Sequence, residues 1–100
     1  MVASENSIEI KADQETSEGY ADIILSHQDS GTVVIMEFKK DINNDEKRLA
    51  AAENAAKQII RKKYVDRFNK SEYAKIYGIG LGFGGKSCAV KSLGNLLEMS

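Results

Sequence analysis

Three short runs in the first two fifths of the chain are rich in apolar residues, and in the first of them apolar and polar residues alternate. The runs occupy residues 7–12, 20–27 and 32–40, and turn-forming stretches such as QDSG separate them. A period of two places successive side chains on opposite faces of a β-strand. The pattern therefore predicts three strands joined as a meander of hairpins.

A long helix is predicted next. Between residue 45 and about residue 68 the sequence contains no Gly or Pro, is rich in Ala and has apolar residues at helical spacing. These features favour one continuous helix. Asn44 or Asp45 can cap its start, because a short polar side chain accepts hydrogen bonds from the first backbone N–H groups.

Alternation returns in residues 74–84, with large apolar residues at odd positions and Gly at even positions from 78 onward. A glycine face lets another backbone approach closely, so we expect this strand inside the sheet, against the helix. Residues 87–92 predict a last strand. The expected fold class is α/β (α+β), a mixed central β-sheet of about five strands with one long helix, in a single domain of residues 1–100.

Composition narrows the class of protein. An apolar content of 42% and a charged content of 29% are ordinary for a globular domain. No apolar run is long enough to span a membrane and the start of the chain lacks signal-peptide features, so we expect a cytoplasmic protein with no membrane partner. Cys88 and His27 are the only residues of their kinds, which excludes an internal disulfide and a zinc or haem ligand set.

The charges are sorted along the chain. Residues 1–46 carry eleven acids and three bases, whereas residues 47–100 carry eleven bases and four acids. A solvated helix and an acidic hairpin would account for this division. It also fits a protein that binds cations with its acidic part and a polyanion with its basic part, as a nuclease requires.

An acid and a base interrupt the apolar strand of residues 32–40. Glu37 and Lys39 share one face of this strand, and burying both would cost several kcal/mol unless they find partners. They could simply point into water at the end of the strand. However, Asp22 lies in the middle of the neighbouring strand, and pairing through the QDSG turn would bring its carboxylate close to Glu37. Two carboxylates suit Mg²⁺ or Mn²⁺, and an adjacent Lys can polarise a water molecule.

The ordered set of motifs carries a family resemblance. GYADIIL is followed by VVIMEFK, then by QIIRKKY on the helix and by KIYGIGLGF on the next strand. This order resembles the PD-(D/E)XK nuclease superfamily, and in particular the branch found at the C-terminus of AAA-ATPase-like bacterial proteins of unknown function. The resemblance covers roughly residues 19–90. It implies a restriction-endonuclease-like core and a metal-dependent nuclease-like domain that hydrolyses the phosphodiester bonds of nucleic acid. The alternative is a catalytically silent interaction or dimerisation module that keeps the nuclease fold.

The resemblance also implies roles for the strand residues. Asp22 takes the place of the metal-binding Asp of the motif, Glu37 that of its second acid, and Lys39 that of its Lys. Mg²⁺ or Mn²⁺ would then be held by both carboxylates and by the backbone carbonyl of Phe38, while Lys39 would orient the attacking water.

Residues of the following helix match the Q…KxY pattern of the same branch. Gln58 would face the site as a fourth catalytic residue, and Lys62 would meet a phosphate or a carboxylate. The partner implied is nucleic acid, with DNA favoured. It would contact a set of helix residues: Lys57, Arg61, Lys62, Lys63 and Tyr64. An ordinary solvated basic face is the alternative interpretation.

One departure from the family pattern concerns the first helix, which often supplies a further acid to the metal site. Only MVASEN precedes the first strand in this sequence, so we expect a core that lacks its first helix. Either Glu5 or Glu9 compensates, or a second chain covers that face of the sheet, or the domain is a fragment with weakened chemistry. A homodimer is the simplest expectation. The alternative is that Leu93, Leu96 and Leu97 of the C-terminal tail fold back over the uncovered face.

A competing motif lies in residues 80–87. GLGFGGKS matches the phosphate-binding pattern G-x-x-x-x-G-K-[ST], which would place Lys86 on phosphates and Ser87 on magnesium. Such a loop must open a helix and needs further strands, which the remaining residues cannot supply. We therefore expect a turn between two strands, with Gly84 and Gly85 at positive φ.

Overall fold

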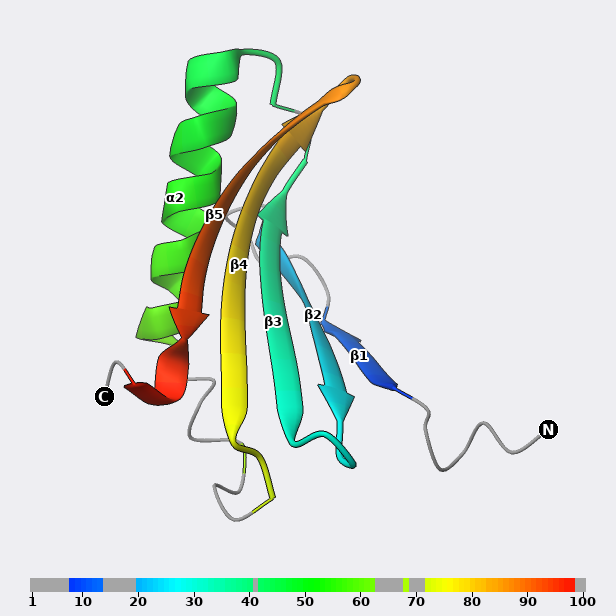
Figure 1. Ribbon diagram of the computed structural model, residues 1–100. Helices are drawn as coiled ribbons and strands as arrows, with labels where there is room; N and C mark the ends of the chain where they lie inside the picture. Colours follow the sequence, from blue (N-terminus) through cyan, green and yellow to red (C-terminus); the bar gives the residue numbers. More distant parts are fainter. Residues whose placement is uncertain (1–7, 14–19, 41, 63–67, 69–71, 99–100) are drawn as a thin grey trace, which may run out of the picture.

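The computed structural model of residues 1–100 describes residues 8–13, 20–40, 42–62, 68 and 72–98. Within these residues, five strands form one sheet in the order β1-β2-β3-β4-β5, and helix α2 covers one of its faces (Figure 1). The elements and their bounds are β1 (Glu9–Asp13), β2 (Tyr20–His27), β3 (Thr32–Lys39), α2 (Asp45–Arg61), β4 (Lys75–Gly84), β5 (Ser87–Asn95) and the 3-10 helix η2 (Leu96–Glu98).

The strand directions make the sheet mixed. β1, β2 and β3 pair antiparallel as a meander, β3 and β4 pair parallel, and β4 and β5 form an antiparallel hairpin. Parallel neighbours need a crossover connection, and α2 lies in the connection between β3 and β4. The predicted α/β fold with five strands and one long helix is therefore confirmed, and it is consistent with a restriction-endonuclease-like core.

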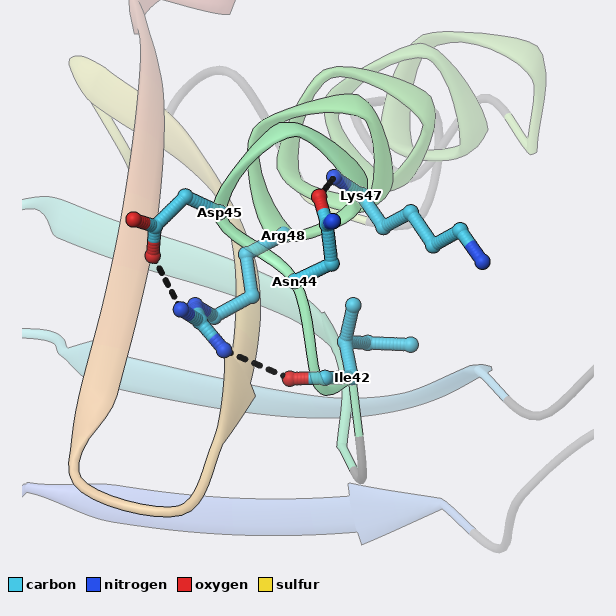
Figure 2. A network of polar contacts seen from close by, with 5 residues as sticks. All are labelled: Ile42, Asn44, Asp45, Lys47 and Arg48. Carbon is cyan, nitrogen blue, oxygen red and sulfur yellow. Dashed lines mark hydrogen bonds and ion pairs between the residues drawn. The ribbon is translucent and has the colours of Figure 1, made fainter.

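Polar contacts among residues 42–48 organise the start of α2 (Figure 2). Asn44, rather than Asp45, is the cap, because its side chain accepts the N–H of Lys47 at 3.2 Å. Arg48 donates to the carbonyl of Ile42 at 2.8 Å and also pairs with Asp45. The N–H of Ile42 donates in turn to Phe83 at 3.2 Å, which joins the helix entry to the end of β4.

The helix ends earlier than its sequence pattern predicts. Its last residue is Arg61, and the N–H of Lys62 closes the final turn on the carbonyls of Gln58 and Ile60. Phe68, the predicted approximate end, lies outside the helix, and residues 63–67 lie outside the described residues. Ile59 is the last residue of α2 that is buried, so packing on the sheet stops at this point although the helical spacing of apolar residues continues.

The glycine face of β4 lies directly under α2, as predicted. A Cβ atom on Gly80 would come within 2.5 Å of the backbone nitrogen of Ala56 and would also overlap the carbonyl oxygen of Ala52. The helix meets this face with small side chains, since Ala52 and Ala56 are both almost fully buried. Glycine on the strand and alanine on the helix therefore allow the two backbones to touch.

Residues 80–87 form the end of β4, a turn and the start of β5, so the phosphate-loop interpretation is excluded. The sequence after Gly85 continues as a strand, whereas that motif requires a helix. Gly85 has a φ of 57°, as expected for a tight hairpin turn. The expectation for Gly84 is wrong, because it takes no positive φ and instead lies against the backbone of Ile42.

The main core lies between α2 and the sheet. It contains a cluster of buried apolar residues: Ile24, Val33, Ile35, Ile59, Ile76 and Leu96. Leu93 and Leu97 pack against this cluster, on the side of the sheet that faces the helix. The tail residues up to Glu98 therefore do not cover the opposite face, which overturns the folded-back alternative. Within the described residues, no helix has the length and apolar character needed to cross a membrane.

Candidate metal and nuclease site

Asp22 on β2 and Glu37 on β3 lie directly opposite each other in the antiparallel pair. Opposed residues of neighbouring strands point to the same face, and here it is the face that α2 covers. Only 3% of Asp22 and 0% of Glu37 is exposed. The QDSG turn produces this register, because Gly31 adopts a φ of 65° and its N–H donates to the carbonyl of Gln28.

Lys62 connects the end of α2 to this carboxylate pair. Its Nζ donates to Oε1 of Glu37 at 2.7 Å and lies 3.8 Å from Oδ2 of Asp22. Side chains on a helix tilt toward its N-terminus, so a residue at the C-terminal cap reaches back over the preceding turn. α2 runs antiparallel to β4, from Gly84 near Ile42 to Gly78 near Ile59. This direction carries the Lys62 ammonium back to the level of Glu37.

The resulting site combines two buried negative groups with one positive group. Two carboxylates held side by side repel each other, and removing them from water adds a desolvation cost. The charge-assisted hydrogen bond that Lys62 donates to Glu37 at 2.7 Å offsets part of the repulsion and part of the desolvation cost. The arrangement explains how a core strand can carry an acid, because Lys62 at the end of the helix is a specific partner for Glu37.

The other predicted strand residues surround this pair. Lys39 lies two positions beyond Glu37 on the same face of β3 and is half-buried. The side chain of Phe38 points to the opposite face, where its ring stacks on Phe83 with centroids 5.8 Å apart. Only the backbone of Phe38 can therefore contribute to the site. Its carbonyl is the group that the family resemblance assigns to metal binding.

The helix residues divide into two groups. Gln58 is half-buried and lies one turn before Lys62, so both project from the same side of α2. Lys57 and Arg61 are exposed. Lys63 and Tyr64, the remaining candidates for nucleic-acid contact, lie outside the described residues. The structure therefore brings Lys62 to the carboxylates and leaves Lys57 and Arg61 on the surface.

Comparison with known proteins adds a separate line of evidence. A family model described as the PD-(D/E)XK nuclease superfamily matches residues 1–93. The chain belongs to this superfamily. No curated protein and no solved structure gives a significant match. In this PD-(D/E)XK domain, the residues to which the sequence resemblance assigns the motif are an acid on β2 and an acid and a lysine on β3, and their roles stay a prediction.

One of the alternatives for the expected lack of the first helix is a further acid from Glu5 or Glu9. Glu5 lies outside the described residues. Glu9 lies opposite Ser26 rather than Asp22, and its carboxylate pairs with Lys11 at 3.3 Å on the surface. The register instead places Asp13 of β1 directly opposite Asp22. The sequence pattern does not indicate this position of Asp13, because it does not specify the register of the β1–β2 hairpin.

The donor chemistry of this superfamily member fits a hard divalent cation. The described residues contain no cluster of three or more His, Cys, Asp or Glu side chains suited to a metal. They do place two buried carboxylates at paired positions, which are the ligands that Mg²⁺ and Mn²⁺ prefer. Mg²⁺ commonly takes one or two protein carboxylates and completes its shell with water and substrate oxygens.

Proposed function

We propose that this domain is a metal-dependent nuclease that hydrolyses phosphodiester bonds of nucleic acid, with DNA as the favoured substrate, in the cytoplasm. The observation that carries the proposal is the pair of buried carboxylates, Asp22 and Glu37, held opposite each other within a PD-(D/E)XK sequence. A purely structural sheet has little reason to bury two like charges side by side, because each costs desolvation energy.

Each residue has a role in this proposal. The carboxylates of Asp22 and Glu37, with the carbonyl of Phe38, would hold Mg²⁺ or Mn²⁺. The ion would supply Lewis-acid activation of a water molecule and of the phosphate. Lys39, on the same face as Glu37, would orient the attacking water, and Gln58 would hold the substrate in place beside the pair.

Nucleic acid would approach along the C-terminal end of α2. Lys57 and Arg61 are exposed there, and their charges attract phosphates without reading sequence. Lys63 and Tyr64, which the sequence also predicts to contact nucleic acid, lie outside the described residues. The proposal also includes Lys62, whose ammonium can bind a phosphate when it is not paired with the carboxylates.

Metal binding provides the test of this function. We expect Mn²⁺ at about 100 times its Kd to stabilise the wild-type domain by about 2.7 kcal/mol, and Asp22→Asn to abolish that gain. Thermal unfolding with and without Mn²⁺ measures it, and labelled single-stranded and duplex DNA and RNA in the same buffer report cleavage. Asp29→Asn, an exposed acid in the β2–β3 turn, is the matched control and should respond like wild type.

The outcomes separate the alternatives. Equal stabilisation of wild type and Asp22→Asn would contradict the site. Stabilisation that depends on Asp22 without any cleavage would indicate the catalytically silent module instead.

We also propose a homodimer formed through the face of the sheet opposite α2. This open face consists of cross-strand rows of apolar residues: Ile23, Met36 and Ile79; Leu25, Val34 and Tyr77; and Phe38, Leu81 and Val90. Val90 is 57% exposed and Ile10, on β1, is 66% exposed. These rows contain no acid or base, so a second copy meets no like charge when it packs on them.

The size of the open face also suits a second copy. Five strands spaced about 4.8 Å apart and about eight residues long give a flat outline of roughly 500 Å², and side-chain relief increases the accessible area. Stable interfaces bury about 800 Å² per partner, and apolar faces of this extent are uncommon on monomers.

Light scattering at micromolar concentration tests the dimer. We expect the mass of two 11.0 kDa chains for wild type and of one chain for Met36→Lys, because Met36 lies in the middle of the apolar rows between Ile23 and Ile79. Ser87→Lys, at the exposed β4–β5 turn, should remain dimeric. A wild-type mass of one chain that does not change on concentrating the protein would refute the proposal.

A further inference from the structure

Lys62 occupies a position between the two carboxylates of the site. Its ammonium is 2.7 Å from Glu37 and 3.8 Å from Asp22, and 28% of its side chain is exposed. Both carboxylates are buried far more deeply than the lysine that binds them. Of the three charged side chains, that of Lys62 has the largest contact with solvent.

The charges at the site allow a divalent cation to replace the Lys62 ammonium beside the two carboxylates. Two adjacent carboxylates need a positive charge nearby to remain ionised together, and one ammonium supplies half of the charge that a divalent cation supplies. An ammonium and a divalent cation beside the same two oxygens would repel each other strongly at low effective dielectric constant. The two cations therefore compete for the pair, and binding of the divalent cation favours departure of the ammonium.

We propose that Lys62 is a built-in counterion that holds Asp22 and Glu37 in place and that a divalent cation must displace before the site becomes active. This role rests on the proposed metal-dependent function. The backbone of Lys62 is fixed by its N–H bonds to Gln58 and Ile60, so the displacement is a movement of the flexible four-carbon side chain alone. Its partial exposure gives the ammonium a short route to solvent.

The displaced ammonium would then be available to a substrate phosphate. Lys62 leaves the carboxylates when the metal arrives, and an anionic substrate stabilises it in its new position. Metal and nucleic acid would therefore favour each other's binding. Metal releases the ammonium that the phosphate would bind, and the phosphate stabilises the ammonium in the position away from the carboxylates. The same lysine would lower the affinity of the domain for metal alone.

Titration of Mn²⁺ by calorimetry tests the proposal without relying on activity. Lys62→Met removes the ammonium, and Lys47→Met removes an exposed lysine of α2 as the matched control. We expect Lys62→Met to bind Mn²⁺ on the order of tenfold more tightly than wild type and to gain more thermal stability from it. Lys47→Met should match wild type.

The possible results distinguish the two levels of the proposal. If wild type and Lys62→Met both bind Mn²⁺ with equal affinity, or if the variant binds it more weakly, the counterion role is wrong while the metal site stands. If neither protein binds Mn²⁺, the metal site itself is wrong and the counterion role fails with it.

A measurement on the wild-type protein covers the case in which Lys62→Met does not fold. Acetylation by a water-soluble reagent, followed by peptide mass spectrometry, reports how accessible each lysine amine is. We expect added Mg²⁺ to increase the labelling rate of Lys62 several-fold, because the amine leaves the carboxylates, and to leave Lys57 unchanged. A labelling rate of Lys62 that does not respond to Mg²⁺ would overturn the displacement.

Discussion

Gly80→Ala should destabilise this domain by about 3 kcal/mol, although it adds a single methyl group. The added Cβ would lie 2.5 Å from the backbone nitrogen of Ala56 and 3.1 Å from its Cα, and it would overlap the carbonyl oxygen of Ala52. Backbone atoms of a helix cannot rotate away as a side chain can, so α2 would have to shift as a whole. Overpacking of this kind typically costs 1–3 kcal/mol or more.

Gly78→Ala is the matched control, because Gly78 lies on the same strand and the same face. Its nearest neighbour is Cδ1 of Leu93 at 2.9 Å, the end of a flexible side chain that can change rotamer. We expect this variant to lose less than about 1 kcal/mol.

Thermal unfolding distinguishes the two variants. For a domain of this size, about 3 kcal/mol corresponds to a fall in Tm of roughly 12–24 °C. Equal Tm values for Gly80→Ala and Gly78→Ala would show that close approach of the helix backbone does not limit this position.

The pairing of Asp22 with Glu37 could be predicted because local chemistry sets it. A four-residue turn with Gly31 at positive φ fixes the register of its own hairpin, and alternation then fixes the face. The glycine pattern of β4 likewise predicts a close helix neighbour, since few other arrangements tolerate so many glycines in a strand. These features depend on residues that are near one another in sequence.

Features that depend on tertiary packing could not be predicted. The helical spacing continues past Ile59, but the sheet that stabilises the helix does not, so the helix ends at Arg61. Gly84 has the sequence context of a turn residue. In the structure, however, the absence of a side chain allows its backbone to lie against the backbone of Ile42. The position of Asp13 opposite Asp22 follows from a register that the intervening residues do not specify.

Within the site, the partner of Lys62 likewise could not be predicted from the sequence. Its place in a basic run indicates either a phosphate or a carboxylate partner, and the sequence favours neither. The choice depends on the direction of α2 across the sheet and on the residue at which the helix ends. Only the assembled fold combines both and directs the ammonium to Glu37 at 2.7 Å.

Glu37→Gln should reduce metal-dependent cleavage by a factor on the order of 10²–10³ while leaving the domain folded. The amide has nearly the same shape as the carboxylate, so the packing around this fully buried position is retained. Lys62 also keeps Asp22 within 3.8 Å as an ionic partner, which limits the cost of the lost charge. What disappears is one of the two negative oxygen donors that a divalent cation would need.

Cleavage rates at saturating Mn²⁺ and nucleic acid, with circular dichroism of the same samples, measure this effect. Glu53→Gln removes an exposed acid from α2 and should cleave like wild type. The contrast matters because a general loss of negative charge would strengthen binding of any polyanion and could change rates without touching the site. A Glu37→Gln protein that is folded and cleaves as fast as Glu53→Gln would show that the buried pair is not the catalytic centre. In that case Glu37 serves only to hold Lys62 and the end of α2 against the sheet.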